Sequence, residues 1–170
     1  GINLDNYPYI EKSYAREQMG LNPNKKYVLF AGAFDNPIKN APLAQAAIKL
    51  IPGAELLELK GYTRQQVATL MQAVDAFLMT SFTEGSPQVI KEALACGCPI
   101  VSVDVGDIRE LLTDVEGCYI VNRNVEHIKN CLEKAITGSE KTGGREVIIE
   151  KHLTNECIAH KIISIYSSVI

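Results

Sequence analysis

The sequence of 170 residues contains no tryptophan, only three histidines and no excess of basic side chains. Its formal net charge is -3 at pH 7, which argues against a nucleic-acid-binding surface and against strong electrostatic attachment to a membrane. No apolar run is long enough to span a bilayer, and the first residues lack the charged and apolar regions of a signal peptide. The length and the apolar fraction of 46% therefore predict one globular domain with a sizeable core.

The residues that commonly form redox, metal or dinucleotide sites are not arranged for those functions. Five cysteines, an odd number without a C-x-x-C pair, predict reduced thiols in a cytoplasmic protein, with Cys96 and Cys98 as small buried side chains. The histidines form no ligand motif, so no metal site is predicted. The absence of G-x-G-x-x-G and of a Walker A motif disfavours dinucleotide-binding and P-loop proteins. The chain begins at Gly1 rather than Met, which predicts a fragment or a processed product.

Strand-like and helix-like segments alternate through most of the chain. Short apolar runs predict strands at residues 27–31, 54–58, 76–79, 99–103 and 117–121. Helices are predicted at residues 13–19, 42–50, 63–72, 87–96, 108–112, 125–137, 145–151 and 155–169, with a linker at 1–10 and a loop at 139–144. The alternation predicts right-handed crossovers and a Rossmann-like α/β domain, in which helices cover both faces of a parallel sheet.

Residues 80–110 contain the helix that organises the predicted site. Ser86 is a good N-cap, Pro87 suits the first helical position, and Gly97 is a good helix stop. The start of such a helix exposes N–H groups and a partial positive charge, so it predicts an anion site. The carboxylate of Glu92 would lie roughly 7–8 Å along the axis from Pro87, about the distance from a phosphate to the ribose of the same nucleotide. The alternative is that Glu92 and Glu84 are solvated surface side chains.

Two further loops follow predicted strands and would lie at the same edge of the sheet. In the first, Gly32 allows close approach of the backbone, and Lys39 could supply a cation to a phosphate. An exposed lysine at a helix start is the alternative for Lys39. In the second loop, Tyr62 could pack on a base or ribose, or could equally be a core or surface tyrosine, and Thr63 is a plausible N-cap.

The segment Glu84-Gly85-Ser86-Pro87, continued by Glu92-Ala93-Leu94-Ala95-Cys96-Gly97-Cys98-Pro99 and by Gly106 and Glu110, resembles the E-x7-E region of family 4 retaining glycosyltransferases with the GT-B fold. The resemblance implies that residues 1–170 are the C-terminal, donor-binding half of a two-domain enzyme, with residues 1–26 as linker and short helix. It implies a nucleotide-sugar donor, a hexose-type sugar, no metal or other cofactor, and an acceptor-binding N-terminal domain outside this sequence. Any peripheral membrane association would occur through that missing domain.

The resemblance also implies roles for individual residues. Glu84, the candidate catalytic residue, would position donor-sugar hydroxyls, Glu92 would accept from the ribose, and Lys39 would meet the diphosphate. Backbone amides would meet the sugar and diphosphate along Gly85, Ser86, Pro87, Gln88 and Val89. Ala33 stands where the family usually has an arginine, so the diphosphate charge would be met differently here.

Two other functions remain open from the sequence. The chain could belong to another GT-B enzyme, such as a sugar-nucleotide epimerase or a phosphorylase. It could also be a non-catalytic nucleotide-sugar-binding or interaction module, which Ala33 favours. The acceptor, the sugar and the base are not determined by these residues.

Overall fold

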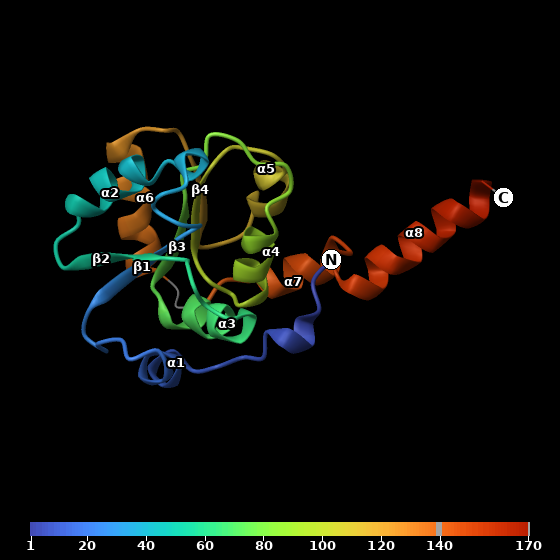
Figure 1. The fold of residues 1–170 in the computed structure, drawn as a ribbon, viewed down its shortest axis with the longest axis horizontal. Helices are drawn as coiled ribbons and strands as arrows, with labels where there is room; N and C mark the ends of the chain where they lie inside the picture. The colour runs from blue at the N-terminus through green and yellow to red at the C-terminus, as the bar shows by residue number, and fades with distance from the viewer. Residues whose placement is uncertain (139–140, 170) are drawn as a thin grey trace.

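The computed structural model describes residues 1–138 and 141–169 as one α/β unit (Figure 1). The elements are η1 (Leu4–Asn6), α1 (Lys12–Gln18), β1 (Lys26–Phe30), η2 (Pro37–Lys39), α2 (Ala41–Lys49), β2 (Ala54–Glu58), α3 (Arg64–Ala73), β3 (Ala76–Met79), α4 (Gln88–Ala95), β4 (Ile100–Val103), α5 (Ile108–Leu112), β5 (Cys118–Val121), α6 (Val125–Thr137), α7 (Gly144–Glu150) and α8 (Asn155–Val169). Each predicted strand and helix is present, with bounds that differ from the prediction by at most one residue. Two residues of the predicted loop 139–144, Ser139 and Glu140, lie outside the described residues.

The five strands form one parallel sheet in the order β2-β1-β3-β4-β5. Alternate side chains of β1 point to opposite faces, with Leu29 in one apolar core and Val28 and Phe30 in the other. Helices α3, α4 and α5 contribute to the first core, and α2 and α6 contribute to the second. The Rossmann-like prediction is therefore confirmed.

The strand order places the site between two crossovers that run in opposite directions. From β1 the chain passes through α2 to β2 on one side, whereas from β3 it passes through α4 to β4 on the other. The loops that leave β1 and β3 consequently lie next to each other at the carboxyl edge of the sheet. Such a switch point is where open α/β sheets usually bind ligands.

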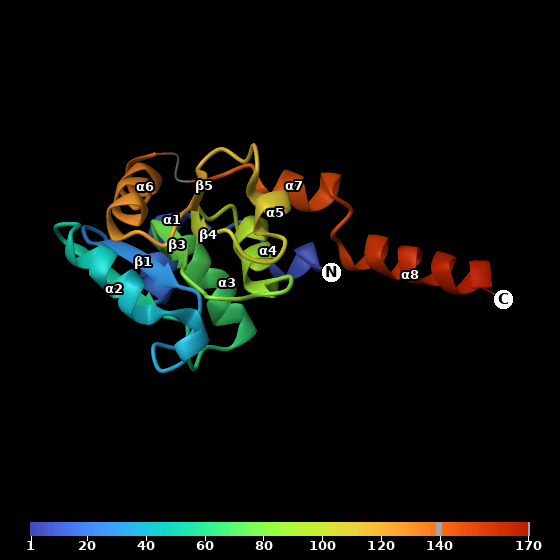
Figure 2. The same ribbon diagram turned by 90° about the horizontal axis from the view of Figure 1, so that it is seen from above.

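The N-terminal segment is packed onto the domain, which corrects its interpretation as a linker. Ile2 and Tyr7 are 1% and 4% exposed, and Ile2 forms a bridge to Thr154. The N-terminus therefore lies where α7 gives way to α8 (Figures 1 and 2). Most of residues 1–10 stay exposed or partly exposed, but the side chains of Ile2 and Tyr7 are buried and attach the segment to distant residues.

Helix α8 extends away from the rest of the unit (Figures 1 and 2). Its apolar side chains Ile162, Ile163, Ile165 and Tyr166 are 48–69% exposed. No helix in the described part of the chain has the length and apolar character needed to cross a bilayer.

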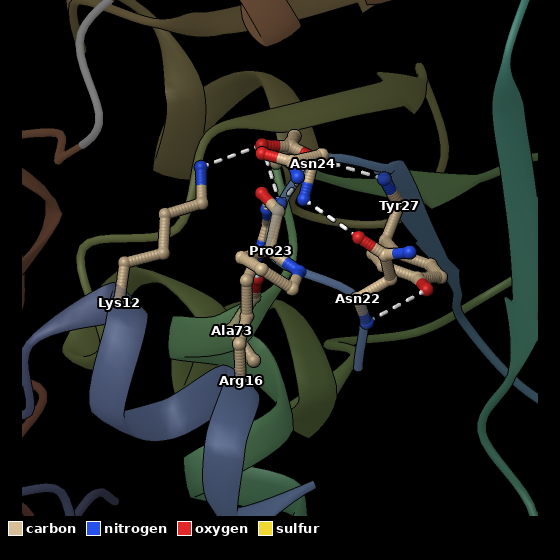
Figure 3. Close-up of polar contacts among 8 residues, drawn as sticks. Lys12, Arg16, Asn22, Pro23, Asn24, Tyr27 and Ala73 are labelled. Carbon is tan, nitrogen blue, oxygen red and sulfur yellow. Dashed lines mark hydrogen bonds and ion pairs between the residues drawn. The ribbon is translucent and has the colours of Figure 1, made fainter. Parts of the chain in front are cut away.

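A buried polar cluster fastens α1 to the start of the sheet (Figure 3). Nη2 of Arg16 lies 3.0 and 2.9 Å from the two carboxylate oxygens of Asp75, while Nε and Nη1 donate to the carbonyls of Ala73 and Pro23. Asp75 also accepts from Lys12 Nζ at 2.6 Å and from the Tyr27 N–H at 2.7 Å. One carboxylate thus joins α1, the start of β1 and the residue before β3.

The five cysteines are all unpaired, as the sequence predicts. Burial raises the pKa of the Cys96 and Cys118 thiols to about 12 and also raises that of Cys98. These thiols therefore stay protonated and serve as apolar packing groups, because the thiolate is the reactive form.

Candidate functional site

The loop between β3 and α4 is fixed to the segment that precedes α2. The Thr80 hydroxyl lies 2.9 Å from the Lys39 carbonyl and 3.0 Å from the Asn40 carbonyl, so it can donate to either. The Phe82 N–H donates to the Ile38 carbonyl at 2.9 Å. Together these contacts place the backbone of Lys39 directly beside the loop that leads to Glu84.

Arg123, which follows β5, supports the same loop from its other side. Its guanidinium donates to the carbonyls of Ser81 and Phe82, at 2.9 and 2.8 Å, and lies 5.8 Å from the centre of the Phe82 ring. No local pattern in the sequence marks Arg123 as part of the site, since its partners lie about forty residues away. The loop is therefore held by cross-links to both neighbouring segments.

The structure brings together two predicted site residues, Lys39 and Glu84. Their Nζ and Oε1 atoms are 2.7 Å apart, and their side chains are only 21% and 16% exposed. Gly32 makes room for this arrangement, because a Cβ there would lie 3.0 Å from Cγ and 3.3 Å from Cδ of Lys39. The close approach that Gly32 allows is therefore with the aliphatic part of the Lys39 side chain.

At the start of α4 the structure corrects one detail of the predicted capping. Pro87, rather than Ser86, is the N-cap residue, and no side chain caps the helix. The Ser86 hydroxyl instead donates to Asp107 and accepts from Lys91, whose Nζ is 3.7 Å from the Asp107 carboxylate. These three side chains connect the helix start to the loop between β4 and α5. Asp107 is 21 residues from Ser86 in sequence and Lys91 lies in the following helix, so local capping rules do not consider either partner.

Gly106 brings the β4–α5 loop into direct backbone contact with Gly85. It adopts φ +58°, and a Cβ there would lie 1.9 Å from the Gly85 carbonyl oxygen. The N–H of the next residue, Asp107, donates to that same carbonyl at 3.2 Å. The orientation of the Gly85 peptide is therefore fixed by a neighbouring loop.

The fixed loop leaves a row of main-chain donors at the N-terminus of α4. Within the described residues, no hydrogen-bond partner is found for the N–H groups of Gly85, Ser86, Gln88 and Val89. Orphan N–H groups at a helix start carry the partial positive charge of the helix dipole. This edge can therefore accept an anion with several oxygens, such as a phosphate.

Glu92 projects from the middle of α4 and is engaged by the N-terminal segment. Burial raises the pKa of its carboxyl, while a hydrogen bond with Tyr7 and the charge of Arg64 act in the opposite direction. Burial likewise raises the pKa of Tyr7, reinforced by the negative charge of Glu92. The carboxylate thus has an internal partner, and its second oxygen can accept from a ligand hydroxyl.

The remaining predicted residues are dispersed. The Val89 side chain packs against the apolar core that α3 and α4 cover. The side-chain amide of Gln88 donates to the Gly1 carbonyl at 3.2 Å. Tyr62 is 38% exposed and lines a separate hollow of about 660 Å³, together with Tyr14 of α1. Thr63 caps α3 as predicted, in a capping box with Gln66.

The chemistry of this edge is that of anion and hydroxyl binding. Main-chain donors and Lys39 suit phosphate oxygens, while Glu84 and Glu92 suit hydroxyl donors. Among residues 1–138 and 141–169, no group of three or more histidine, cysteine or acidic side chains is arranged to hold a metal ion.

Comparison with known proteins adds a family match. The family model described as glycosyl transferases group 1 matches residues 21–137. Among curated relatives, the D-inositol 3-phosphate glycosyltransferase of Mycobacterium marinum is 24% identical over 157 residues, which cover 74% of this chain and 34% of that protein. The chain thus spans about a third of the length of this relative.

Solved structures share the fold at low sequence identity. Sucrose-phosphate synthase from Thermosynechococcus elongatus matches with a TM-score of 0.87 and 20% identity, over 99% of this chain and 51% of that chain. The Anabaena protein HepE, solved in complex with UDP and glucose, matches with a TM-score of 0.78 and 20% identity, over 99% of this chain and 55% of its own. Both likenesses show the fold, and the chain corresponds to about half of each structure.

Proposed function

The chain belongs to the group 1 glycosyltransferases, and on this basis we propose that it is the donor-binding half of a retaining enzyme with the GT-B fold. In this proposal it binds a nucleotide-sugar and places the sugar for transfer of a hexose-type group to an acceptor. The acceptor site lies in a part of the protein outside this sequence. No observation specifically favours the alternatives, an epimerase or a phosphorylase.

One observation carries this proposal: an ammonium, a carboxylate and four orphan amides lie together on the loops after β1 and β3 and at the start of α4, with a second carboxylate, Glu92, further along that helix. Lys39 and Glu84 are in contact at 2.7 Å, and the orphan N–H groups follow directly from Gly85. A nucleotide-sugar presents the matching groups in one molecule, since its diphosphate is an acceptor and its sugar and ribose are donors. The complex of HepE with UDP and glucose supports this ligand class.

In the proposed reaction the bond between the anomeric carbon of the sugar and the diphosphate oxygen breaks, and an acceptor hydroxyl forms the new bond to that carbon and releases its proton to solvent. The nucleoside diphosphate leaves with the negative charge. The orphan amides from Gly85 to Val89 and the Lys39 ammonium would stabilise that charge as it develops. Glu84 would hold sugar hydroxyls and Glu92 the ribose, so both act by positioning. Fixed donors of this kind make a metal ion at the diphosphate unnecessary, and the proposal includes none.

The isolated chain should bind donor weakly and transfer nothing, because it spans only half of each matched structure. The proposal places the complete protein in the cytoplasm. Any peripheral association with a membrane would occur through the part that lies outside this sequence.

Thermal unfolding and calorimetry with UDP, GDP and ADP test the proposal. A ligand present at 100 times its Kd stabilises the folded state by about 2.7 kcal/mol, which corresponds to roughly 5–10 °C for a chain of this length. Glu92→Ala should reduce the shift, whereas Glu126→Ala, an exposed carboxylate on the opposite face of the sheet, should leave it unchanged. If none of the three nucleotides stabilises the protein, or if Glu92→Ala behaves like Glu126→Ala, the proposal fails.

Ala33 favours a second candidate, a module that binds nucleotide-sugar without catalysis. The resemblance predicts an arginine there, and alanine offers no charge to a leaving diphosphate. The two candidates differ in the complete protein: a transferase releases nucleoside diphosphate from its donor when acceptor is added, whereas a binding module does not.

A further inference from the structure

Lys39 and Glu84, which are proposed to contact different parts of the donor, contact each other in the ligand-free protein. Lys39 and Glu84 are paired at 2.7 Å and are both more than three-quarters buried. A lysine held this way presents little net positive charge to an incoming phosphate, because its own counterion is already in place. A diphosphate that binds Lys39 therefore competes with a carboxylate that is already in place.

We propose that Glu84 is the internal counterion of Lys39, and that donor binding transfers the ammonium from this carboxylate to the diphosphate. The inference rests on the proposed function and concerns selectivity within the same site. Glu84 loses its partner in the exchange and needs new donors, which the hydroxyls of an attached sugar can supply. A nucleoside diphosphate without sugar satisfies Lys39 but leaves Glu84 unpaired, so the site favours the intact donor over the product.

The surroundings restrict the exchange to the ends of the two side chains. The lysine stem is confined against Gly32, because a Cβ at that position would lie only 3.0 Å from Cγ of Lys39. The backbone of Lys39 is held by the Thr80 hydroxyl, and the loop before Glu84 is held by Arg123. Because these backbone contacts are fixed, rotation of the side-chain termini is sufficient to release the ammonium.

A second lysine–carboxylate pair at the same edge serves as a matched control. Lys60 and Asp35, on the loops after β2 and β1, are also 2.7 Å apart, but their side chains are 55% and 72% exposed. Water screens such a pair strongly, so the pair should have little effect on the affinity of the site for a nucleotide. Removing Asp35 changes the net charge of this edge by the same amount as removing Glu84.

The test measures binding of UDP, GDP and ADP by calorimetry, each to the wild type, Glu84→Gln, Lys39→Met, the double variant and Asp35→Asn. Glu84→Gln should bind the preferred nucleoside diphosphate about three to ten times more tightly than the wild type, since its lysine is no longer neutralised. The gain should disappear in the Lys39→Met background, as the double-mutant cycle requires. Asp35→Asn should change the affinity by less than about twofold. Glu84→Ala provides a second variant, because glutamine still accepts a hydrogen bond from lysine.

The outcomes separate this inference from the proposed function. If the wild type binds a nucleotide and neither Glu84 variant binds more tightly, the counterion role is refuted while the donor site stands. An equal gain from Asp35→Asn, or a gain that persists without Lys39, also refutes it, because long-range charge then explains the effect. Binding by Glu84→Gln alone supports the inference, and no binding by any variant overturns both proposals.

Discussion

Replacement of Asp75 by alanine should lower the free energy of unfolding of this domain by about 3–5 kcal/mol, the usual cost of removing one partner of a buried ion pair. Four hydrogen bonds converge on this carboxylate, two of them from Arg16. Arg16 is 7% exposed, so in the variant its guanidinium would be a buried charge without an anion. The N–H of Tyr27 would also lose its acceptor at the start of β1.

The predicted loss of stability depends mainly on the polar groups that remain after Asp75 is removed. Arg16 keeps its bonds to the carbonyls of Ala73 and Pro23, which compensate part of its charge and place the cost within that range rather than above it. Lys12 is more exposed than Arg16 and can turn towards water, so its loss of Asp75 adds little. The total is a large fraction of the 5–15 kcal/mol that stabilises a typical domain.

Urea and thermal unfolding would measure the effect, with a decrease in Tm of roughly 6–20 °C expected for a chain of this length. Asp35→Ala is the matched control, since Asp35 is 72% exposed and its only ion-pair partner among the described residues is Lys60. That substitution should cost less than about 1 kcal/mol. If Asp75→Ala costs no more than Asp35→Ala, the cluster does not hold α1 in place and the reasoning is wrong.

Two further substitutions test the loop and the helix of the donor site. Gly106→Ala would place a methyl group 1.9 Å from the Gly85 carbonyl oxygen, so it should abolish nucleotide binding in calorimetry. Gly20→Ala is the control, because Gly20 has a similar φ but lies in open space. It should lower the stability by only about 1–2 kcal/mol and leave binding intact. Glu92→Gln should stabilise the domain at pH 7, because burial raises the pKa of Glu92 and the ionised carboxyl is disfavoured in the folded state. That advantage should disappear as the pH falls below the ordinary value of 4.5, where the carboxyl is protonated in both states; equal gains in thermal melts at about pH 4 and pH 7 would contradict it.

The strands and helices could be predicted because their signals are local. Each signal lies in or next to the element that it marks: the apolar runs form the strands, Gly97 follows α4, and Thr63 caps α3. The packing of residues 1–10 could not be predicted in this way. The apolar residues of this stretch follow no helical or strand period, and the burial of Ile2 and Tyr7 depends on partners such as Leu153 and Glu92.

The proposed donor site shows the same division between local and distant information. The turn at Gly85 and the helix after it follow from the sequence, and Lys39 and Glu84 could each be selected as candidates. Their mutual contact could not be foreseen, since forty-five residues separate them and the strand order has to bring their loops together. The role of Asp107 could not be foreseen for the same reason, since it is 21 residues from Ser86. Lys91 is only five residues from Ser86, but the preference of Ser86 as an N-cap is the stronger local signal.

The charges of this edge explain how the site could work without the arginine that the resemblance predicts at position 33. Lys39, Lys60 and Lys91 each contact a carboxylate, so none of them presents an uncompensated charge in the ligand-free protein. The orphan amides at the start of α4 have no such counterion, and their positions are fixed by the contact between Gly85 and Gly106. A site of this kind would recognise a phosphate by the geometry of its donors, and Lys39 would contribute only when a ligand replaces its carboxylate. Affinity for simple anions should therefore be low, and it should rise with each hydroxyl that a ligand offers to the carboxylates it displaces.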